Sequence, residues 1–215
     1  DIQWGNHDVL WMGAASGCDA CIATVIRNNL KYDNIRMLES GYGISLRTLT
    51  LFAEKTYKNI DPMKAALKAI SVILFKLEGQ IIMRHPEYKM DDSMMLHKID
   101  YDNGTIEIEG KTYKLNDRDF PTVDRENCYE LSSDEKSLVK DLRKAFVESK
   151  VLREHIEFLY SKGSLYKVFN NNLLYHGCIP LDEKGDFDTI FLEGKEFSGK
   201  SYMDYADKMA RKAFY

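Results

Sequence analysis

Two short motifs, Gly5-Asn6-His7-Asp8 and Tyr175-His176-Gly177, dominate the interpretation of this sequence. Each follows an apolar segment that predicts a short strand, at residues 1–4 and 173–175. Ligands collect at the tips of strands in α/β folds, and glycine lets the backbone turn sharply or approach closely there. The motifs therefore predict one site built from the ends of two strands that are far apart in the sequence.

The side chains of these motifs suit metal-assisted chemistry. The Asn6 carboxamide offers a neutral oxygen to a metal, and a neutral His176 imidazole suits manganese, iron or zinc. His7 can donate a proton to a leaving oxygen, and Asp8 can hold or tune such a group. Each motif taken singly has a plainer interpretation, because Asn and Gly are ordinary turn residues and a histidine can simply bond a backbone carbonyl.

Apolar spacing predicts helices over residues 9–30, 45–57, 61–84, 131–160 and 201–213. Asp61 is a favoured N-cap, and Pro62 suits the first helical turn that follows it. Alternating apolar residues around Asp102-Asn103-Gly104 predict a hairpin near residues 97–115. Asn170-Asn171-Asn172 predicts another over residues 165–175, and residues 187–196 predict a third. The expected fold class is therefore mixed, α+β or α/β.

Composition excludes several classes of function. The chain has 215 residues, a formal net charge of −4 and a pI near 5.8, so no nucleic-acid partner is expected. The longest apolar stretch, residues 65–77, contains Lys68 and Lys76 and is too short to span a bilayer, so no membrane partner is expected. A phosphorylated ligand would have to be held by metal or by local cations.

The four cysteines do not suggest a disulfide scaffold, and reduced thiols in a cytoplasm are the expectation. Cys18-Asp19-Ala20-Cys21 has zinc-like spacing, but no second pair lies nearby, so packed core cysteines in a helix are expected. Cys178 is expected to be a small packed residue beside the second motif. His155 falls on an apolar helical face, which predicts a bonded core histidine. Gly163 is expected to be a helix C-cap.

Together the two motifs resemble the third and fourth blocks of the calcineurin-like metallophosphoesterase pattern. Residues 1–15, DIQWGNHDVLWMGAA, resemble the signature of class III (Firmicutes-type) fructose-1,6-bisphosphatases. Further blocks that resemble this family are Gly41-Tyr42-Gly43-Ile44, His97-Lys98-Ile99-Asp100-Tyr101, Phe120-Pro121-Thr122, Tyr160-Ser161-Lys162-Gly163-Ser164 and residues 170–180. The resemblance covers essentially the whole chain.

The resemblance implies a cytoplasmic, Mn²⁺-dependent phosphatase with a two-metal site. In gluconeogenesis such an enzyme hydrolyses the 1-phosphate of the sugar phosphate fructose 1,6-bisphosphate with metal-activated water. Asn6 then resembles a ligand of the second metal and of the substrate phosphate, and His176 resembles another ligand of that metal. His7 resembles the acid that protonates the leaving alkoxide. Asp8 is expected to support the site without binding metal directly.

The family pattern also requires Asp-x-His, Gly-Asp-x-x-Asp-Arg and Gly-His blocks, and this sequence contains none of them. The chain therefore looks like an internal fragment that is inactive alone, binds metal weakly and needs the remaining segments of the same enzyme. A homo-oligomer is possible. The alternatives are another metallophosphoesterase, such as a protein phosphatase or nucleotidase, and a non-catalytic interaction module.

His176 follows Asp8 by 168 positions (176 minus 8), far more than a βα connection needs. We therefore expect part of a metallophosphoesterase core, a strand–loop–helix plus a β-hairpin, at residues 1–44 and 166–215. Residues 45–165 would be a large, mainly helical insertion with the hairpin near residues 97–115. The insertion could be a cap that selects the sugar and orders the site, or it could serve packing or oligomer contacts.

Overall fold

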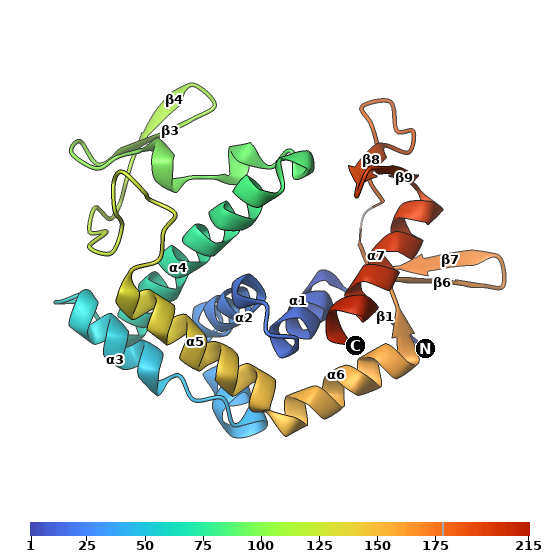
Figure 1. Ribbon diagram of the computed structural model, residues 1–215, viewed down its shortest axis with the longest axis horizontal. Coiled ribbons are helices and arrows are strands. Elements are labelled where there is room, and N and C mark those ends of the chain that lie inside the picture. The colour runs from blue at the N-terminus through green and yellow to red at the C-terminus, as the bar shows by residue number, and fades with distance from the viewer. Residues whose placement is uncertain (178) are drawn as a thin grey trace. The chain divides into compact units, whose positions relative to one another are not determined.

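The computed structural model describes residues 1–177 and 179–215, which form two compact units (Figure 1). Unit 1 comprises Asp1–Ile22 and Phe146–Tyr215, and unit 2 comprises Ala23–Ala145. Both units contain helices and small sheets, which confirms the mixed fold class. The predicted segment limits stay predictions, and Cys178 lies outside the described residues.

Unit 1 combines helices with pairs of short strands. Its elements are β1 (Ile2–Gln3), α1 (Asn6–Ala15), α6 (Lys150–Lys162), β5 (Gly163–Ser164), β6 (Tyr166–Phe169), β7 (Asn172–Tyr175), β8 (Thr189–Leu192), β9 (Lys195–Ser198) and α7 (Lys200–Phe214). β1 pairs with β5 in parallel, with Ile2 opposite Gly163 and Gln3 opposite Ser164. β6–β7 and β8–β9 are antiparallel, which confirms the two hairpins expected here.

Trp4 anchors the core of unit 1. Its side chain is buried and meets the Tyr160 ring edge-on, with 5.2 Å between the ring centroids. The Trp4 Nε1–H donates to the Leu159 carbonyl at 3.1 Å. Arg211 of α7 lies over the Trp4 ring and donates to the carbonyls of Tyr160 at 2.8 Å and Gly163 at 2.7 Å. These bonds connect β1 and β5 to α6 and α7, so the residues that follow β1 start from a well-packed position.

The single helix predicted over residues 9–30 is wrong, because the chain forms α1 and then a separate helix, α2 (Asp19–Lys31). Gly17 has a φ of 85°, the left-handed conformation that ends many helices. The next residue, Cys18, accepts a hydrogen bond from Ile22 N at 2.9 Å and so starts α2. A glycine among alanines therefore acted as a helix end and not as a helical small residue.

The single helix predicted over residues 131–160 is also wrong, because it divides into α5 (Ser133–Glu148) and α6. The hydroxyl of Ser149 accepts from Leu152 N at 3.4 Å, so this serine caps α6. Gly163 is the C-cap of α6, as expected, but its φ of −127° is extended. The reason for glycine there is packing, since a Cβ on Gly163 would overlap the Trp4 ring.

Unit 2 contains the larger helices. Its elements after α2 are a π-helical turn η1 (Met37–Gly41), α3 (Arg47–Thr56), α4 (Pro62–Arg84), the 3₁₀ turns η2 (Pro86–Tyr88), η3 (Asp91–Ser93) and η4 (Leu96–Lys98), strands β2 (Ile99–Asp100), β3 (Thr105–Ile108) and β4 (Lys111–Lys114), and most of α5. α3 packs along α4, and β2–β3–β4 form an antiparallel sheet that confirms the hairpin near residues 97–115 (Figure 1). Asp61 caps α4 by accepting from Met63 N at 3.0 Å, as expected.

A buried ion pair joins α4 to α5 inside unit 2. Lys76 Nζ donates to Glu135 Oε2 at 2.7 Å, and their side chains are 0% and 1% exposed. Lys76 Nζ also donates to the Thr122 carbonyl at 2.6 Å, and Glu135 Oε2 accepts from Ser132 N at 2.8 Å. Each charge therefore has a second polar partner, which a buried ion pair needs in order to be tolerated.

Two expectations about single residues are wrong. His155 is exposed on α6, because the buried stripe of that helix is Leu152, Ile156 and Tyr160. Cys18 is exposed at the start of α2 and is not a core cysteine. Among the helices of the described residues, none is long and apolar enough to cross a membrane.

Candidate functional site

The first turn of α1 presents the residues of the first motif. Gly5 is the N-cap, so Asn6 and His7 open the helix, and both are exposed. Asp8 is half-buried, and its Oδ2 accepts from Gly5 N at 2.8 Å. Val9 N donates back to the Gly5 carbonyl at 3.1 Å, which closes the turn. The Asn6 amide and the His7 imidazole are thus exposed at the first turn of α1. The Asp8 carboxylate stabilises this turn through its hydrogen bond to Gly5 N.

Gly5 is needed for a close approach and not for its backbone conformation. Its φ of −92° and ψ of 174° are extended values that any residue adopts. A Cβ on Gly5, however, would lie 3.0 Å from both Cε1 and Nε2 of the His176 imidazole. His176 follows β7 and is exposed. The structure therefore brings the two motifs together, with the second histidine against the residue that precedes Asn6.

A cavity of about 450 Å³ in unit 1 gives a second link between the motifs. Asn6 and Gly177 share its wall, and the rest of the lining is largely apolar. The other lining residues are Trp4, Val9, Leu10, Leu165, Tyr202, Met203, Ala206 and Ala210. The cavity runs between the start of α1 and the face of α7, so Asn6 stands at the edge of an apolar hollow.

The start of α1 is the kind of helix end that can bind an anion. The first backbone N–H groups of a helix have no partner inside the helix and carry a partial positive charge. α1 is 10 residues long and begins with the two exposed motif residues, Asn6 and His7. A phosphate group placed there could accept hydrogen bonds from the helix start and from the Asn6 amide. A phosphate bound at the start of α1 would meet two exposed polar side chains, Asn6 and His7.

The donor chemistry fits one part of a metal site. An imidazole nitrogen and a carboxamide oxygen suit divalent transition metals, and the His176 ring lies against Gly5, the residue before Asn6. Such ions take about four to six ligands. In residues 1–177 and 179–215, no group of three or more His, Cys, Asp or Glu side chains could hold a metal ion. The chemistry of Asn6 and His176 would therefore supply at most two of the ligands that such an ion needs.

The polar residues of α7 that position the base of the site were not predicted from the sequence. Asp207 Oδ2 accepts from Leu165 N at 3.0 Å, and Asp207 Oδ1 accepts from Arg211 Nε at 2.6 Å. Hydrogen bonds from Lys200 and Tyr166 lower the pKa of a further α7 carboxyl, Asp204. The available signal was an Asp–Arg pair spaced by four residues within an amphipathic helix.

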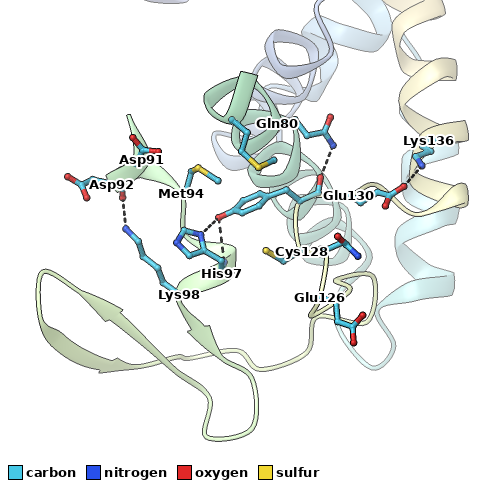
Figure 2. A pocket seen from close by; sticks show the side chains of 13 residues that line it. Gln80, Asp91, Asp92, Met94, His97, Lys98, Glu126, Cys128, Glu130 and Lys136 are labelled. Carbon is cyan, nitrogen blue, oxygen red and sulfur yellow. Dashed lines mark hydrogen bonds and ion pairs between the residues drawn. The ribbon is translucent and has the colours of Figure 1, made fainter. Parts of the chain in front are cut away.

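A second and larger cavity, of about 930 Å³, lies within unit 2 (Figure 2). His97 Nδ1 and the Tyr129 hydroxyl are 2.8 Å apart on its wall, and Gln80 Nε2 donates to the Tyr129 carbonyl at 2.7 Å. The remaining lining residues are Met83, Asp91, Asp92, Met94, Lys98, Glu126, Asn127, Cys128, Glu130 and Lys136. Burial raises the pKa of Tyr129 and of Cys128. None of the four predicted site residues lines this cavity.

Comparisons with known proteins agree with the motifs. The family model of the Firmicute fructose-1,6-bisphosphatases matches residues 1–215. The protein named fructose-1,6-bisphosphatase class 3 in Clostridium novyi (strain NT) is 50% identical over 235 residues, covering 100% of this chain and 35% of that relative. The Clostridium tetani protein of the same name is also 50% identical, and that of Clostridium acetobutylicum is 47% identical, each with the same coverage.

The chain thus spans about a third (35%) of the length of the curated relatives that it matches. No solved structure matches it. Because the family model matches every residue and the paired motifs meet in the fold, the chain belongs to the Firmicute fructose-1,6-bisphosphatase family.

Proposed function

We propose that this chain is part of a bacterial fructose-1,6-bisphosphatase that removes the 1-phosphate of fructose 1,6-bisphosphate in gluconeogenesis. The observation that carries the proposal is the match of the family model to residues 1–215, with relatives up to 50% identical that bear this name. The approach of His176 to Gly5 supports it, because a phosphatase site needs these two motifs at one place.

Each predicted site residue takes a role that its position supports. Asn6 would bind a metal through its carboxamide oxygen and would donate a hydrogen bond to the substrate phosphate from its amide NH₂. His176 supplies a metal ligand from the loop after β7. His7 gives its proton to the sugar oxygen as the phosphate leaves, which is a contribution typical of general acids. Asp8 keeps Asn6 and His7 in place through its hydrogen bond to Gly5 N.

We further propose that the metal is Mn²⁺, bound as a pair. Bound divalent ions would supply Lewis acidity to the phosphate oxygens and lower the pKa of the attacking water. The chain's own part is to fix the carboxamide and the imidazole on one side of that pair. Its helix start also offers N–H groups to the anionic substrate.

The chain alone is expected to be inactive, with the rest of the enzyme completing the site. The β6–β7 hairpin supports this, because among the described residues its strands pair only with each other. Its exposed large hydrophobic side chains are Val168, Phe169, Leu173, Leu174 and Tyr175, with exposed fractions from 42% to 60%. Leu173 and Leu174 are adjacent, so their side chains point to opposite faces of the strand, and both faces expose apolar surface. We propose that the remaining segments of the same polypeptide bury these two faces.

The predicted segment limits stand as part of the proposal. Residues 1–44 and 166–215 belong to a metallophosphoesterase core, and residues 45–165 form the insertion. The substrate is a charged metabolite that does not cross bilayers readily, so the cytoplasm is the proposed location. Assembly into a homo-oligomer stays a prediction.

The test is an assay of the full-length protein beside the isolated 215-residue chain. With Mn²⁺, the full-length protein should release phosphate from fructose 1,6-bisphosphate, and the chain alone should not. A substrate panel that includes a nucleoside monophosphate and a phosphopeptide separates a sugar phosphatase from the other metallophosphoesterases. Preference of the full-length protein for either of those substrates would contradict the sugar-phosphate assignment, and full turnover by the isolated chain would contradict its incompleteness.

A further inference from the structure

The phosphatase proposal makes no use of Cys18 and Cys21, yet the fold places these two thiols together. They are the N-cap and the third residue of α2, and the helix turn between them is closed by Ile22 N donating to the Cys18 carbonyl at 2.9 Å. Two residues at this spacing have Cα atoms roughly 5 Å apart. That separation falls inside the range of about 4.4–6.8 Å over which disulfides form.

The surroundings of Cys18 favour its thiolate. Its side chain is exposed at the positive end of α2. A hydrogen bond from the Cys21 thiol, together with bonds from the backbone N–H groups of Cys21 and Ala20, lowers the pKa of Cys18 to about 6, against the opposing effect of burial. A thiolate at an accessible helix start is the usual setting of a reactive cysteine.

Cys21 is the complementary partner. It is half-buried, and its hydrogen bond to Cys18 and its burial raise the pKa of its thiol. Its sulfur packs on α1, because a Cβ on Gly13 would lie only 2.5 Å from the Cys21 Sγ. Cys18 is therefore the more accessible and the more acidic of the two thiols, and Cys21 is the more sheltered. That asymmetry assigns the attacking role to Cys18 and the resolving role to Cys21.

We propose that Cys18 and Cys21 are a redox-active dithiol that undergoes thiol–disulfide exchange with low-molecular-weight disulfides. The Cys18 thiolate attacks one sulfur of the disulfide, forms a mixed disulfide and releases one thiolate. Cys21 then loses its proton and attacks the Cys18 sulfur, which forms the Cys18–Cys21 disulfide and releases the second thiolate. Starting from the Cys18 thiolate and the Cys21 thiol, the protein gives up two electrons and the Cys21 proton, and the small disulfide becomes two thiolates, one of which can take up that proton.

A zinc site is the competing use of this pair. Structural zinc needs about four ligands. Over the described ranges, no group of three or more His, Cys, Asp or Glu side chains is suitably placed. The pair would then hold a metal through two thiolates only, and exchange chemistry is the better use of its asymmetry.

The location of the pair links it to the candidate site. The Cys21 sulfur rests on Gly13, and Gly13 belongs to α1, the helix that begins with Asn6 and His7. The Cys18–Cys21 pair is therefore in contact with the helix that carries the first site motif.

The test uses the intact 215-residue chain equilibrated with mixtures of reduced and oxidised dithiothreitol at pH 7. After acid quenching and alkylation, mass spectrometry should find a species lighter by two hydrogens, with one peptide link between Cys18 and Cys21. Its fraction should follow the ratio of oxidised to reduced reagent and should vanish in Cys18→Ser and Cys21→Ser. The matched control is Cys128→Ser, which changes a buried cysteine of unit 2 and should leave the transition unchanged.

The second measurement is the rate of Cys18 alkylation by iodoacetamide as a function of pH. The midpoint should lie near pH 6 and should rise in Cys21→Ser, whereas an ordinary thiol has its midpoint near pH ~8.5. The midpoint is the readout because a lower pKa also lowers the nucleophilicity of the thiolate, so the rate at one pH does not discriminate. Circular dichroism of each variant verifies folding.

The outcomes decide between the two uses of the pair. A Cys18 that titrates as an ordinary thiol, with no Cys18–Cys21 link in excess oxidised reagent, overturns the proposal. A stoichiometric zinc ion that copurifies with the chain and blocks alkylation also overturns it. A mixed disulfide that stops at Cys18 in the folded protein would remove Cys21 from its resolving role and would overturn the dithiol mechanism.

Discussion

The Lys76–Glu135 pair of unit 2 and the Asn6–His176 corner of unit 1 use polar side chains in opposite ways. Lys76 and Glu135 are 0% and 1% exposed, and each has a second hydrogen-bond partner. Asn6, His7 and His176 are all exposed on rigid supports. Buried polar groups with satisfied bonds stabilise a fold, whereas exposed groups held in place remain available to a ligand.

Aromatic packing and hydrogen bonding explain how exposed residues can still be well positioned. Trp4 and Arg211 fix the strand before the first motif, and Asp8 fixes the helix start after it. The site therefore depends on supports that are themselves buried or half-buried. Substitutions in the two regions should separate into effects on activity and effects on stability.

The largest expected effect is on activity. His7→Ala in the full-length enzyme should lower kcat by about 10²–10⁴, because a positioned general acid contributes that much. The free energy of unfolding should hardly change, since His7 is exposed. Steady-state kinetics on fructose 1,6-bisphosphate measure the first quantity and urea titration the second. His85→Ala is the matched control, as His85 is a histidine of unit 2 paired with Glu87, and it should keep full activity.

A His7→Ala enzyme with nearly normal kcat would contradict the acid role. It would also remove the contrast between the two regions, because the first motif would then be a simple helix cap.

Breaking the ion pair should give the largest effect on stability. Lys76→Ala leaves the Glu135 carboxylate buried without its cation and should cost about 3–5 kcal/mol of unfolding free energy. Lys76→Met combined with Glu135→Leu removes both charges and should cost less than Lys76→Ala alone. Lys55→Ala breaks the exposed pair with Asp134 and should cost under about 1 kcal/mol.

Urea denaturation of the isolated chain, followed by circular dichroism, measures all three variants. Equal losses for Lys76→Ala and Lys55→Ala would show that burial does not distinguish the two ion pairs.

Gly5→Ala should affect metal binding more than stability. Its new Cβ would press on the His176 imidazole, which is exposed and can rotate away from the site. We expect roughly a tenfold loss of Mn²⁺ affinity in the full-length enzyme, the size typical of a displaced ligand support. Gly41→Ala is the control, because its Cβ would meet no atom closer than 3.9 Å. Isothermal titration with Mn²⁺ makes the comparison, and unchanged affinity in Gly5→Ala would argue against His176 as a ligand.

The smallest effect concerns the helix start. Asp8→Ala removes the acceptor for Gly5 N and should cost ~1 kcal/mol, as loss of a helix cap does. A chain of this size would then melt about 2–4 °C lower. Asp8→Asn keeps an acceptor oxygen and should recover most of the loss. If both variants melt like the unchanged chain, the Asp8 bond does not support α1 in solution.

Local patterns were enough to predict much of the fold. Asp61-Pro62 predicted the start of α4, and Asn170-Asn171-Asn172 predicted the β6–β7 turn, because caps and tight turns depend on a few neighbouring residues. Local patterns failed at Gly17 and Ser149, where small residues inside an apolar repeat ended one helix and started another. The same helix break moved Cys18 from an expected core to an exposed helix start.

Sequence alone identified the candidate residues Asn6, His7, Asp8 and His176, since those side chains after strand ends have a recognisable chemistry. Only the tertiary structure decided that His176 lies against Gly5, that Arg211 holds the base of the first motif, and that Cys21 rests on Gly13. The physical reason is the separation along the chain of the residues that interact. Caps, turns and motif chemistry arise from residues a few positions apart, whereas these contacts join segments that meet only when helices and strands pack together.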